Sequence, residues 1–260
     1  MKILMLGDVV GRPGRAALKK RLPGLREEFG PDLVVANAEN ASGGLGLSAK
    51  NARELLALGL DVMTTGNHVW KFRDLYNVLN TEPRLLRPAN YPPGAPGRGA
   101  GVFTTASGVR VGVLNLLGRT YMPPVDCPFR AADALLEELA GGADVIVADF
   151  HAEATSEKAA MAHHLAGRAA LLAGTHTHVQ TSDARVLPGG LAFITDLGMC
   201  GPTDSCLGMK AEPIVGMFLS GLPTRFEVSG GPARVQGALV EIDETTGRAL
   251  AVRAIDLPGE

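Results

Sequence analysis

Near its start the sequence reads Ile3-Leu4-Met5-Leu6-Gly7-Asp8, where four apolar residues in a row meet a glycine and then a carboxylate. A short apolar run bounded by a turn residue is typical of a strand that is buried on both faces. Comparable runs follow at Leu33–Ala36 and at Asp61–Thr64. We therefore predict that these three segments are core strands of one sheet.

Helical patterns separate the three strands. In Arg15–Phe29 apolar residues recur at three- and four-residue spacing, although Pro23 predicts a kink or a break there. Ala49–Leu58 is the second predicted helix, and Gly59 follows it at the usual position of a helix-ending glycine. Alternation of strands and helices predicts parallel strands joined by crossover connections.

The second half of the chain is richer in strand patterns. A loop at Arg87–Gly101 leads into a predicted hairpin, Gly101–Thr105 with Val109–Asn115. The remaining predicted segments are helices at Phe129–Leu139 and Glu157–Gly167, strands at Asp144–Phe150 and Ala169–Ala173, and antiparallel strands at Arg185–Leu187, Leu191–Asp196, Ala233–Ile242 and Ala249–Ile255. This content predicts an α/β protein with two packed sheets, and we expect residues 1–260 to form a single domain.

Composition narrows the class of protein. With 46% hydrophobic and 20% charged residues, the chain has ample material for a core. A net charge of −2 gives no general attraction to long nucleic acid, so we expect a small ligand and no stable nucleic-acid complex. The sequence shows neither a signal peptide nor a membrane span, and its three cysteines imply no disulfide framework. We expect a cytoplasmic protein that does not bind membranes.

Metal-capable side chains follow the predicted strands. Because ligands of parallel α/β sheets bind at the carboxyl ends of the strands, these residues are expected to meet at one edge. They are Asp8, Glu39, Asn40, Asn67, His151, His176 and His178. Imidazole, carboxylate and amide donors without sulfur suit manganese, iron or zinc. Seven donors suit two ions, which can activate water and hold the oxygens of a displacement at phosphorus.

Taken singly, most of these residues also have a structural interpretation. Asp8 could cap the following segment, and the two asparagines could be turn residues. His151 could be a hydrogen-bonded core histidine. His176 and His178 are harder to explain in this way, because side chains two apart in an extended segment point the same way. The recurrence of such residues after five strands favours a metal site.

Other polar motifs are interpreted as structural. His163-His164 lies within a predicted helix and is expected at the surface. Cys200 and Cys206 flank a predicted loop. The stretch Gly43-Gly44-Leu45-Gly46 could cradle a phosphate with backbone N–H groups, but it lacks the lysine of a nucleotide-binding loop.

Five blocks together resemble the calcineurin-like metallophosphoesterases, and in particular their bacterial YmdB-like phosphodiesterase branch. The blocks are Gly7-Asp8-Val9-Val10-Gly11, Asn37-Ala38-Glu39-Asn40, Thr65-Gly66-Asn67-His68-Val69-Trp70, Asp149-Phe150-His151-Ala152-Glu153 and Gly174-Thr175-His176-Thr177-His178. Val10 stands where the wider superfamily has a histidine, and Glu39 replaces the usual bridging aspartate. Both departures are features of the YmdB-like branch.

The resemblance implies a four-layer α/β/β/α sandwich of two mixed sheets. It implies that Glu39 bridges two ions, which are iron or manganese, with zinc as an alternative. Asp8, Asn40 and His178 would complete one ion site, and Asn67, His151 and His176 the other. It further implies hydrolysis of 2′,3′-cyclic, or alternatively 3′,5′-cyclic, nucleotides, with His68 as the acid that protonates the leaving oxygen.

Two other functions stay open at this stage. The same metals could serve a phosphomonoesterase or nuclease, or a regulatory scaffold that binds a nucleotide and uses metal structurally. A homo-oligomer is compatible with the sequence. Substrate-selecting residues are expected in four loops, namely Gly43–Leu47, Arg87–Gly101, Arg119–Arg130 and Met199–Leu207.

Overall fold

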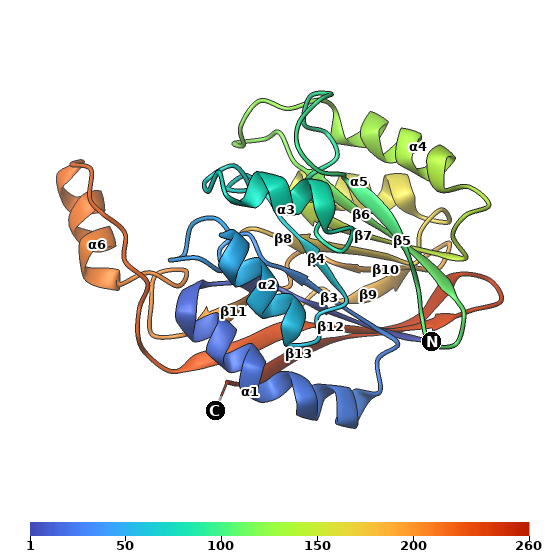
Figure 1. Ribbon diagram of the computed structural model, residues 1–260, viewed down its shortest axis with the longest axis horizontal. Coiled ribbons are helices and arrows are strands. Elements are labelled where there is room, and N and C mark those ends of the chain that lie inside the picture. The colour runs from blue at the N-terminus through green and yellow to red at the C-terminus, as the bar shows by residue number, and fades with distance from the viewer. Residues whose placement is uncertain (260) are drawn as a thin grey trace.

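Two β-sheets lie at the centre of the computed structural model, which describes residues 1–259 (Figure 1). The first sheet has the order β2-β11-β12-β1-β3-β4, and β13 pairs with β12. Its strands are β1 (Lys2–Leu6), β2 (Asp8–Val9), β3 (Leu33–Asn37), β4 (Val62–Thr64), β11 (Met199–Pro202), β12 (Ala233–Asp243) and β13 (Arg248–Pro258). β1, β3 and β4 are parallel neighbours, whereas β12 runs antiparallel to β1.

The second sheet has the order β5-β6-β7-β8-β10-β9. Its strands are β5 (Ala100–Thr104), β6 (Arg110–Leu117), β7 (Val145–His151), β8 (Leu171–Thr175), β9 (Arg185–Leu187) and β10 (Leu191–Ile194). The hairpin β5-β6 and the parallel series β6-β7-β8 follow the sequence prediction. β10 was expected to be antiparallel to its neighbours, but it pairs with β9 antiparallel and with β8 parallel.

Helices cover the outer face of each sheet. They are α1 (Gly11–Phe29), α2 (Ala49–Ala57), α3 (Leu75–Thr81), α4 (Pro128–Leu139) and α5 (Thr155–Leu165). A further helix, α6 (Ala211–Ser220), covers neither sheet. α1, α2 and α3 pack on the first sheet, and α4 and α5 pack on the second. The four-layer α/β/β/α sandwich implied by the resemblance is therefore confirmed.

The alternation of side chains along each strand creates the layers. In β1, Leu4 and Leu6 pack against α1 and α2, whereas Ile3 and Met5 face the second sheet. In β6, Val111 and Val113 belong to the same inter-sheet core. Because successive strand residues point to opposite faces, an unbroken apolar run fills two cores at once.

Several expectations from the sequence are corrected by the structure. α1 continues through Pro23 and ends at Gly30, which adopts the left-handed conformation. Cys200 lies in the buried strand β11 and not in a loop, because β11 pairs with β2 and β12. The strands β2 and β11 and the helices α3 and α6 were not predicted.

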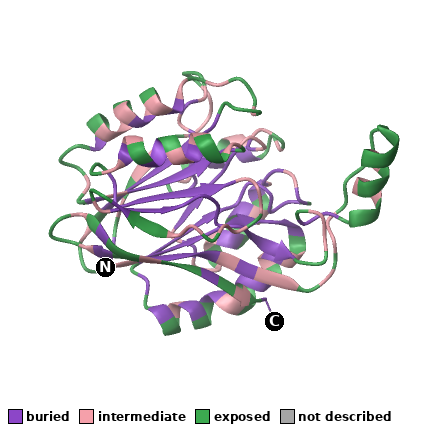
Figure 2. Cartoon of the chain, turned by 180° about the vertical axis from the view of Figure 1, so that it is seen from behind, coloured by how far each residue is buried: buried purple, intermediate pink, exposed green. Residues whose placement is uncertain are grey.

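Helix α6 projects from the body of the protein, and none of its residues is buried (Figures 1 and 2). Phe218 and Leu219 are among its exposed apolar side chains. Among the described residues, every helix is too short or too polar to span a bilayer.

Candidate metal centre

All seven predicted ligand residues lie at the carboxyl ends of parallel strands, but these strands belong to both sheets. Asp8 is in β2, and the residue pairs Glu39-Asn40 and Asn67-His68 follow β3 and β4 of the first sheet. His151 is the last residue of β7, and His176 and His178 follow β8 of the second sheet. The site therefore lies on the seam between the sheets and not at the edge of one sheet.

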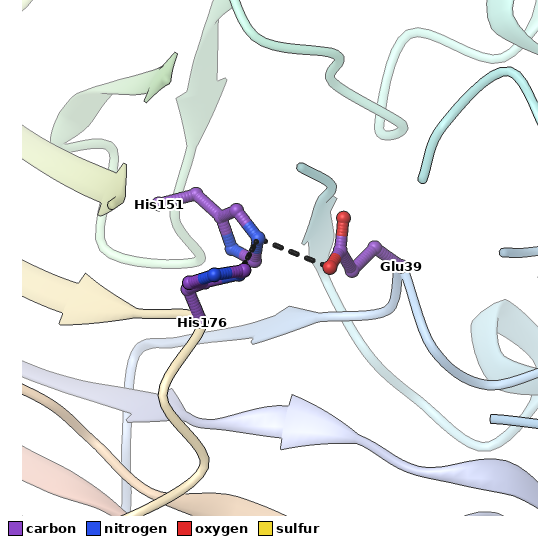
Figure 3. Close-up of side chains that lie close together, drawn as sticks. All are labelled: Glu39, His151 and His176. Atoms are coloured by element: carbon purple, nitrogen blue, oxygen red, sulfur yellow. Dashed lines mark hydrogen bonds and ion pairs between the residues drawn. The ribbon is translucent and has the colours of Figure 1, made fainter. Parts of the chain in front are cut away.

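His151 is the centre of one group of side chains. Its Nε2 atom lies 3.0 Å from Glu39 Oε1 and 3.1 Å from His176 Nδ1 (Figure 3). The same atom lies 3.0 Å from Asn67 Oδ1. One imidazole nitrogen carries either a single proton or a single lone pair, so it cannot satisfy three polar neighbours. The ligand atoms of Glu39, His151 and His176 lie within 4.8 Å of one another, which is compatible with one shared metal ion.

Asp8, Asn40 and His178 form a second group beside the first. His178 Nε2 lies 3.7 Å from Asp8 Oδ1 and 3.1 Å from Asn40 Nδ2. Asn40 Nδ2 in turn lies 3.2 Å from Glu39 Oε1, so Glu39 contacts both groups. The glutamate thus lies where a bridging ligand is expected.

The carboxylate of Asp8 is buried but incompletely bonded. Its Oδ2 atom accepts the backbone N–H of His176 at 3.0 Å. Its Oδ1 atom has no hydrogen-bond partner among the described residues. An unpaired buried acceptor costs about 1–3 kcal/mol, so this atom fits a cation ligand better than a structural cap.

Burial and mutual proximity shift the pKa values of Asp8, Glu39 and His151. Burial raises the pKa of Asp8 to about 6, although His178 and His151 oppose this shift. Burial would also raise the pKa of Glu39, but His151 and His68 outweigh it and hold that pKa well below its usual value. Burial by itself would lower the pKa of His151, but the neighbouring carboxylates of Glu39, Asp8 and Asp149 raise that pKa to about 9. Negative charge is thus concentrated around His151.

His176 shows the opposite shift. Burial, together with the neighbouring His151, lowers its pKa to about 3. A neutral imidazole is the form that binds metal ions, and His176 directs Nδ1 at the cluster. Its Nε2 atom lies 3.1 Å from the exposed carboxylate of Glu153, which orients the ring from outside.

His68 lies beside the cluster and is one-third exposed. Its backbone N–H donates to Glu39 Oε2 at 3.1 Å. The ring atom Nδ1 lies 3.0 Å from Asn40 Oδ1 and 3.2 Å from Glu39 Oε1. Nε2 has no partner among the described residues, so one ring nitrogen is held and the other is available.

A buried polar network, which was not predicted from the sequence, sets the orientation of His151. Thr175 Oγ1 donates to Asp149 Oδ1 at 2.7 Å and lies 2.9 Å from His151 Nδ1. Because the hydroxyl proton is directed at Asp149, the hydroxyl oxygen accepts the Nδ1 proton of His151. In the neutral ring, which is the form that binds metal, Nε2 then presents its lone pair to the cluster. The sequence does contain a signal for Asp149, because it is a charged residue within the otherwise apolar run of β7.

The segment that carries His176 and His178 was predicted to be extended, and this prediction was wrong. The two residues have φ angles of 101° and 63°, which lie in the left-handed region. His178 Nδ1 donates to the backbone oxygen of Leu207 at 2.9 Å. Hydrogen bonds from distant parts of the chain, and not strand alternation, therefore direct both rings into the cluster.

The other motifs occupy the positions expected for structural residues. His163 is exposed on α5. His164, also on α5, has its Nε2 atom 2.9 Å from Oδ1 of Asp133 on α4. The glycines Gly43, Gly44 and Gly46 all adopt positive φ angles in the loop after β3.

A family model described as "YmdB-like protein" matches residues 4–255. The chain belongs to this family. A 2′,3′-cyclic-nucleotide 2′-phosphodiesterase from Bacillus subtilis (strain 168) is 45% identical over 255 residues, which cover 98% of this chain and 96% of the relative. The family resemblance that was inferred from the five blocks is thereby confirmed.

Two solved structures share the fold. A structure described as a novel phosphatase from Mycoplasma pneumoniae is 37% identical, with a TM-score of 0.93 over 99% of this chain and 93% of that one. The calcineurin-like phosphoesterase YfkN from B. subtilis is 15% identical, with a TM-score of 0.62 over 100% of this chain and 90% of that one, so it shares the fold. The expectation of a metallophosphoesterase-type hydrolase agrees with these relatives.

Proposed function

We propose that the YmdB-like protein described here is a dinuclear metal-dependent phosphodiesterase that hydrolyses 2′,3′-cyclic nucleotides. The observation that carries this proposal is the convergence of buried donors from both sheets around Glu39, together with the unpaired Asp8 Oδ1 atom. The substrate class rests on the B. subtilis relative, which is named for that activity.

In this proposal Glu39 would be shared by the two ions. Asp8, Asn40 and His178 would hold one ion, and Asn67, His151 and His176 would hold the other. The donor set is rich in imidazole and lacks sulfur, which suits manganese, iron or zinc. The family resemblance favours iron or manganese among these, with zinc as the alternative. When bound, the metals supply Lewis-acid activation of water and of the phosphoryl oxygens.

We assign His68 the role of general acid. Asn40 and Glu39 fix the Nδ1 side of the ring, so Nε2 is free to face the leaving oxygen of a bound phosphodiester. Partial exposure of the ring gives a substrate access to this atom, which the fully buried His151 does not offer. A general acid of this kind contributes about 10²–10⁴-fold to the rate.

The selection of the nucleotide is assigned to the loops around the centre. A hollow of about 400 Å³ is lined by residues of two of the predicted loops, including Arg87, Tyr91 and Arg130. The ring of Tyr91 packs edge-on against Trp70, at a centroid distance of 5.1 Å. Trp70 belongs to the same sequence block as His68, so the hollow adjoins the block that carries the proposed acid.

The proposal is tested with protein purified anaerobically, analysed for metal and assayed on a panel of 2′,3′- and 3′,5′-cyclic nucleotides. We expect two transition-metal ions per chain and turnover of the 2′,3′-cyclic substrates. His68→Ala should keep both ions and lose about 10²–10⁴-fold in kcat. Wild-type turnover by this variant would show that His68 is not the general acid. Stoichiometric metal without hydrolysis of any phosphoester would instead support a regulatory scaffold.

A phosphomonoesterase with the same metals is the second candidate, because the M. pneumoniae relative is described as a phosphatase. The two activities separate on simple substrates. Preferential cleavage of p-nitrophenyl phosphate over bis-p-nitrophenyl phosphate would favour the monoesterase, and the reverse order would favour the diesterase.

A further inference from the structure

The turn His176-Thr177-His178 is an unfavourable piece of backbone. Both histidines adopt positive φ angles, which cost a residue other than glycine of order 1–3 kcal/mol each. Such a conformation persists only where the surroundings hold it in place. The turn therefore needs fixed anchors if both rings are to face the same metal centre.

Three anchors hold the turn, one at each residue. Asp8 Oδ2 accepts the N–H of His176 at 3.0 Å, and Leu207 O accepts from His178 Nδ1 at 2.9 Å. The central anchor is Asp196, whose Oδ2 atom accepts the N–H of Thr177 at 3.1 Å. Asp196 is the only one of the three that contacts neither His176 nor His178 directly.

Asp196 is part of a buried ion pair. The same Oδ2 atom accepts from Lys158 Nζ at 2.7 Å, and both side chains are essentially inaccessible to solvent. Lys158 belongs to α5, on the far side of the second sheet from the first. A buried ion pair is often no more stabilising than apolar residues of the same volume, so the stability of the core alone does not explain it.

Hydrogen bonds through Gly198 also connect the ion pair with Asp8. Asp196 Oδ1 accepts the N–H of Gly198 at 2.9 Å, and the oxygen of Gly198 accepts the N–H of Asp8 at 3.1 Å. One carboxylate thus connects the backbone of the histidine turn with the backbone of the first proposed ligand. Those two segments come from different sheets.

Gly174 leaves room for the side chain of Lys158. A Cβ atom at this position would lie 2.9 Å from Lys158 Cδ and would collide with the backbone oxygen of Thr195. The glycine that opens the block Gly174–His178 is therefore required by the path of the Lys158 side chain and by the neighbouring strand.

We propose that the buried Lys158–Asp196 ion pair is a positioning device that holds the turn His176-Thr177-His178 in its left-handed conformation and so presents both imidazoles to the metal ions. This inference rests on the proposed function, because it requires that the two histidines bind metal. Neither Lys158 nor Asp196 touches the metals or the substrate. Both act through the backbone of Thr177.

The test compares metal binding by metal-free wild type, Lys158→Met and the double variant Lys158→Met/Asp196→Asn, titrated with Mn²⁺ against a chelating dye. The double variant leaves no unpaired buried charge, so it carries the test even where the single variant fails to fold. We expect Mn²⁺ affinity about 10–100-fold weaker, the range found for residues that support metal ligands. Amide exchange of the peptide that contains Thr177 should also become faster.

Arg26→Met is the matched control, since it breaks the partly buried Arg26–Asp61 pair at the other end of the strands. It should leave Mn²⁺ affinity and exchange at Thr177 unchanged. Wild-type affinity and wild-type exchange in the double variant would overturn the positioning role while leaving the metal centre intact. Failure of the wild type to bind any of Mn²⁺, Fe²⁺ and Zn²⁺ would overturn the proposed function and, with it, this inference.

Discussion

The two ends of the parallel strands use aspartate in opposite ways. At the amino ends, Asp32, Asp61 and Asp144 each come one residue before a strand and accept a backbone N–H from the neighbouring strand. Two of them also pair with an arginine at the surface. At the carboxyl ends, Asp8 is fully buried, and its Oδ1 atom has no partner among the described residues.

This difference separates residues that build the sheet from residues that bind. The amino-end carboxylates are satisfied by the protein itself and keep access to water. The carboxylate of Asp8 is desolvated without full compensation, which costs free energy unless a cation is present. Aspartate thus stabilises the fold at the amino ends of the strands, whereas at the carboxyl ends Asp8 is the proposed ligand of a cation.

The sharpest test of this contrast is Asp8→Asn. We expect loss of metal binding and at least about a 100-fold fall in kcat/KM, more than is typical for outer-sphere residues. Above pH 6 the metal-free variant should nevertheless be more stable than wild type, by on the order of 1–3 kcal/mol, because it buries no charge. Urea unfolding in the presence of a chelator measures this. Lower stability of the metal-free variant would mean that Asp8 is a structural residue.

A smaller effect is expected from Thr175→Val, which removes the hydroxyl between Asp149 and His151. His151 would lose the acceptor that fixes its tautomer, so metal affinity should fall by about 10–100-fold. Thr65→Val is the control, because that buried hydroxyl donates to the backbone oxygen of Leu86 and not to a histidine. Equal losses in the two variants would show that the hydroxyl of Thr175 serves packing alone.

The stability of the metal-free protein should depend on pH. The pKa of His151 is about 9 in the folded protein, above its ordinary value of 6.5. A raised pKa stabilises the folded state below pH 6.5, and this contribution is lost as the pH rises through 9. We expect a loss of about 3 kcal/mol across that window.

His151→Gln should flatten this dependence. The metal-loaded enzyme should lack it as well, because metal binding requires the neutral imidazole. Thermal unfolding at a series of pH values, with and without chelator, makes the measurement. A flat profile for the metal-free wild type would contradict the assigned charge on His151.

The smallest effect is expected at the other end of the strands. Asp61→Asn weakens the contact with Arg26 and the hydrogen bond from the N–H of Val34, so unfolding free energy should fall by about 1 kcal/mol. Metal content and turnover should stay at wild-type values. Asp61→Asn should therefore lower stability without changing activity, whereas Asp8→Asn should raise the stability of the metal-free protein and lower activity. Matching changes in the two variants would remove the contrast between the ends.

Much of this arrangement was accessible from the sequence. Apolar runs located the core strands, and the seven metal-capable residues after them do lie together in the structure. β2 escaped prediction because it has only two residues, and β11 because its sequence Met-Cys-Gly-Pro ends in two residues that are typical of turns. Lys158 escaped because a lysine in a helical pattern is normally solvated, and only the fold shows that it points at Asp196.

The backbone of the histidine turn was misjudged for a related reason. Nothing local in Thr175-His176-Thr177-His178 indicates positive φ angles, since residues other than glycine rarely adopt them. The anchors Asp8, Asp196 and Leu207 are distant in sequence. Long-range hydrogen bonds therefore decided the one local conformation on which the proposed centre depends most.

The pairing of the first strand has a consequence for biosynthesis. β1 lies between β3 and β12, and β2 pairs with β11, so Asp8 acquires some of its neighbours, among them His176 and Gly198, only from the last third of the chain. Ribosomes add about 5–20 residues per second, so many seconds separate the emergence of Asp8 from that of its partners. A nascent chain released early would expose an unsealed hydrophobic edge, and cofactor loading belongs after translation has finished.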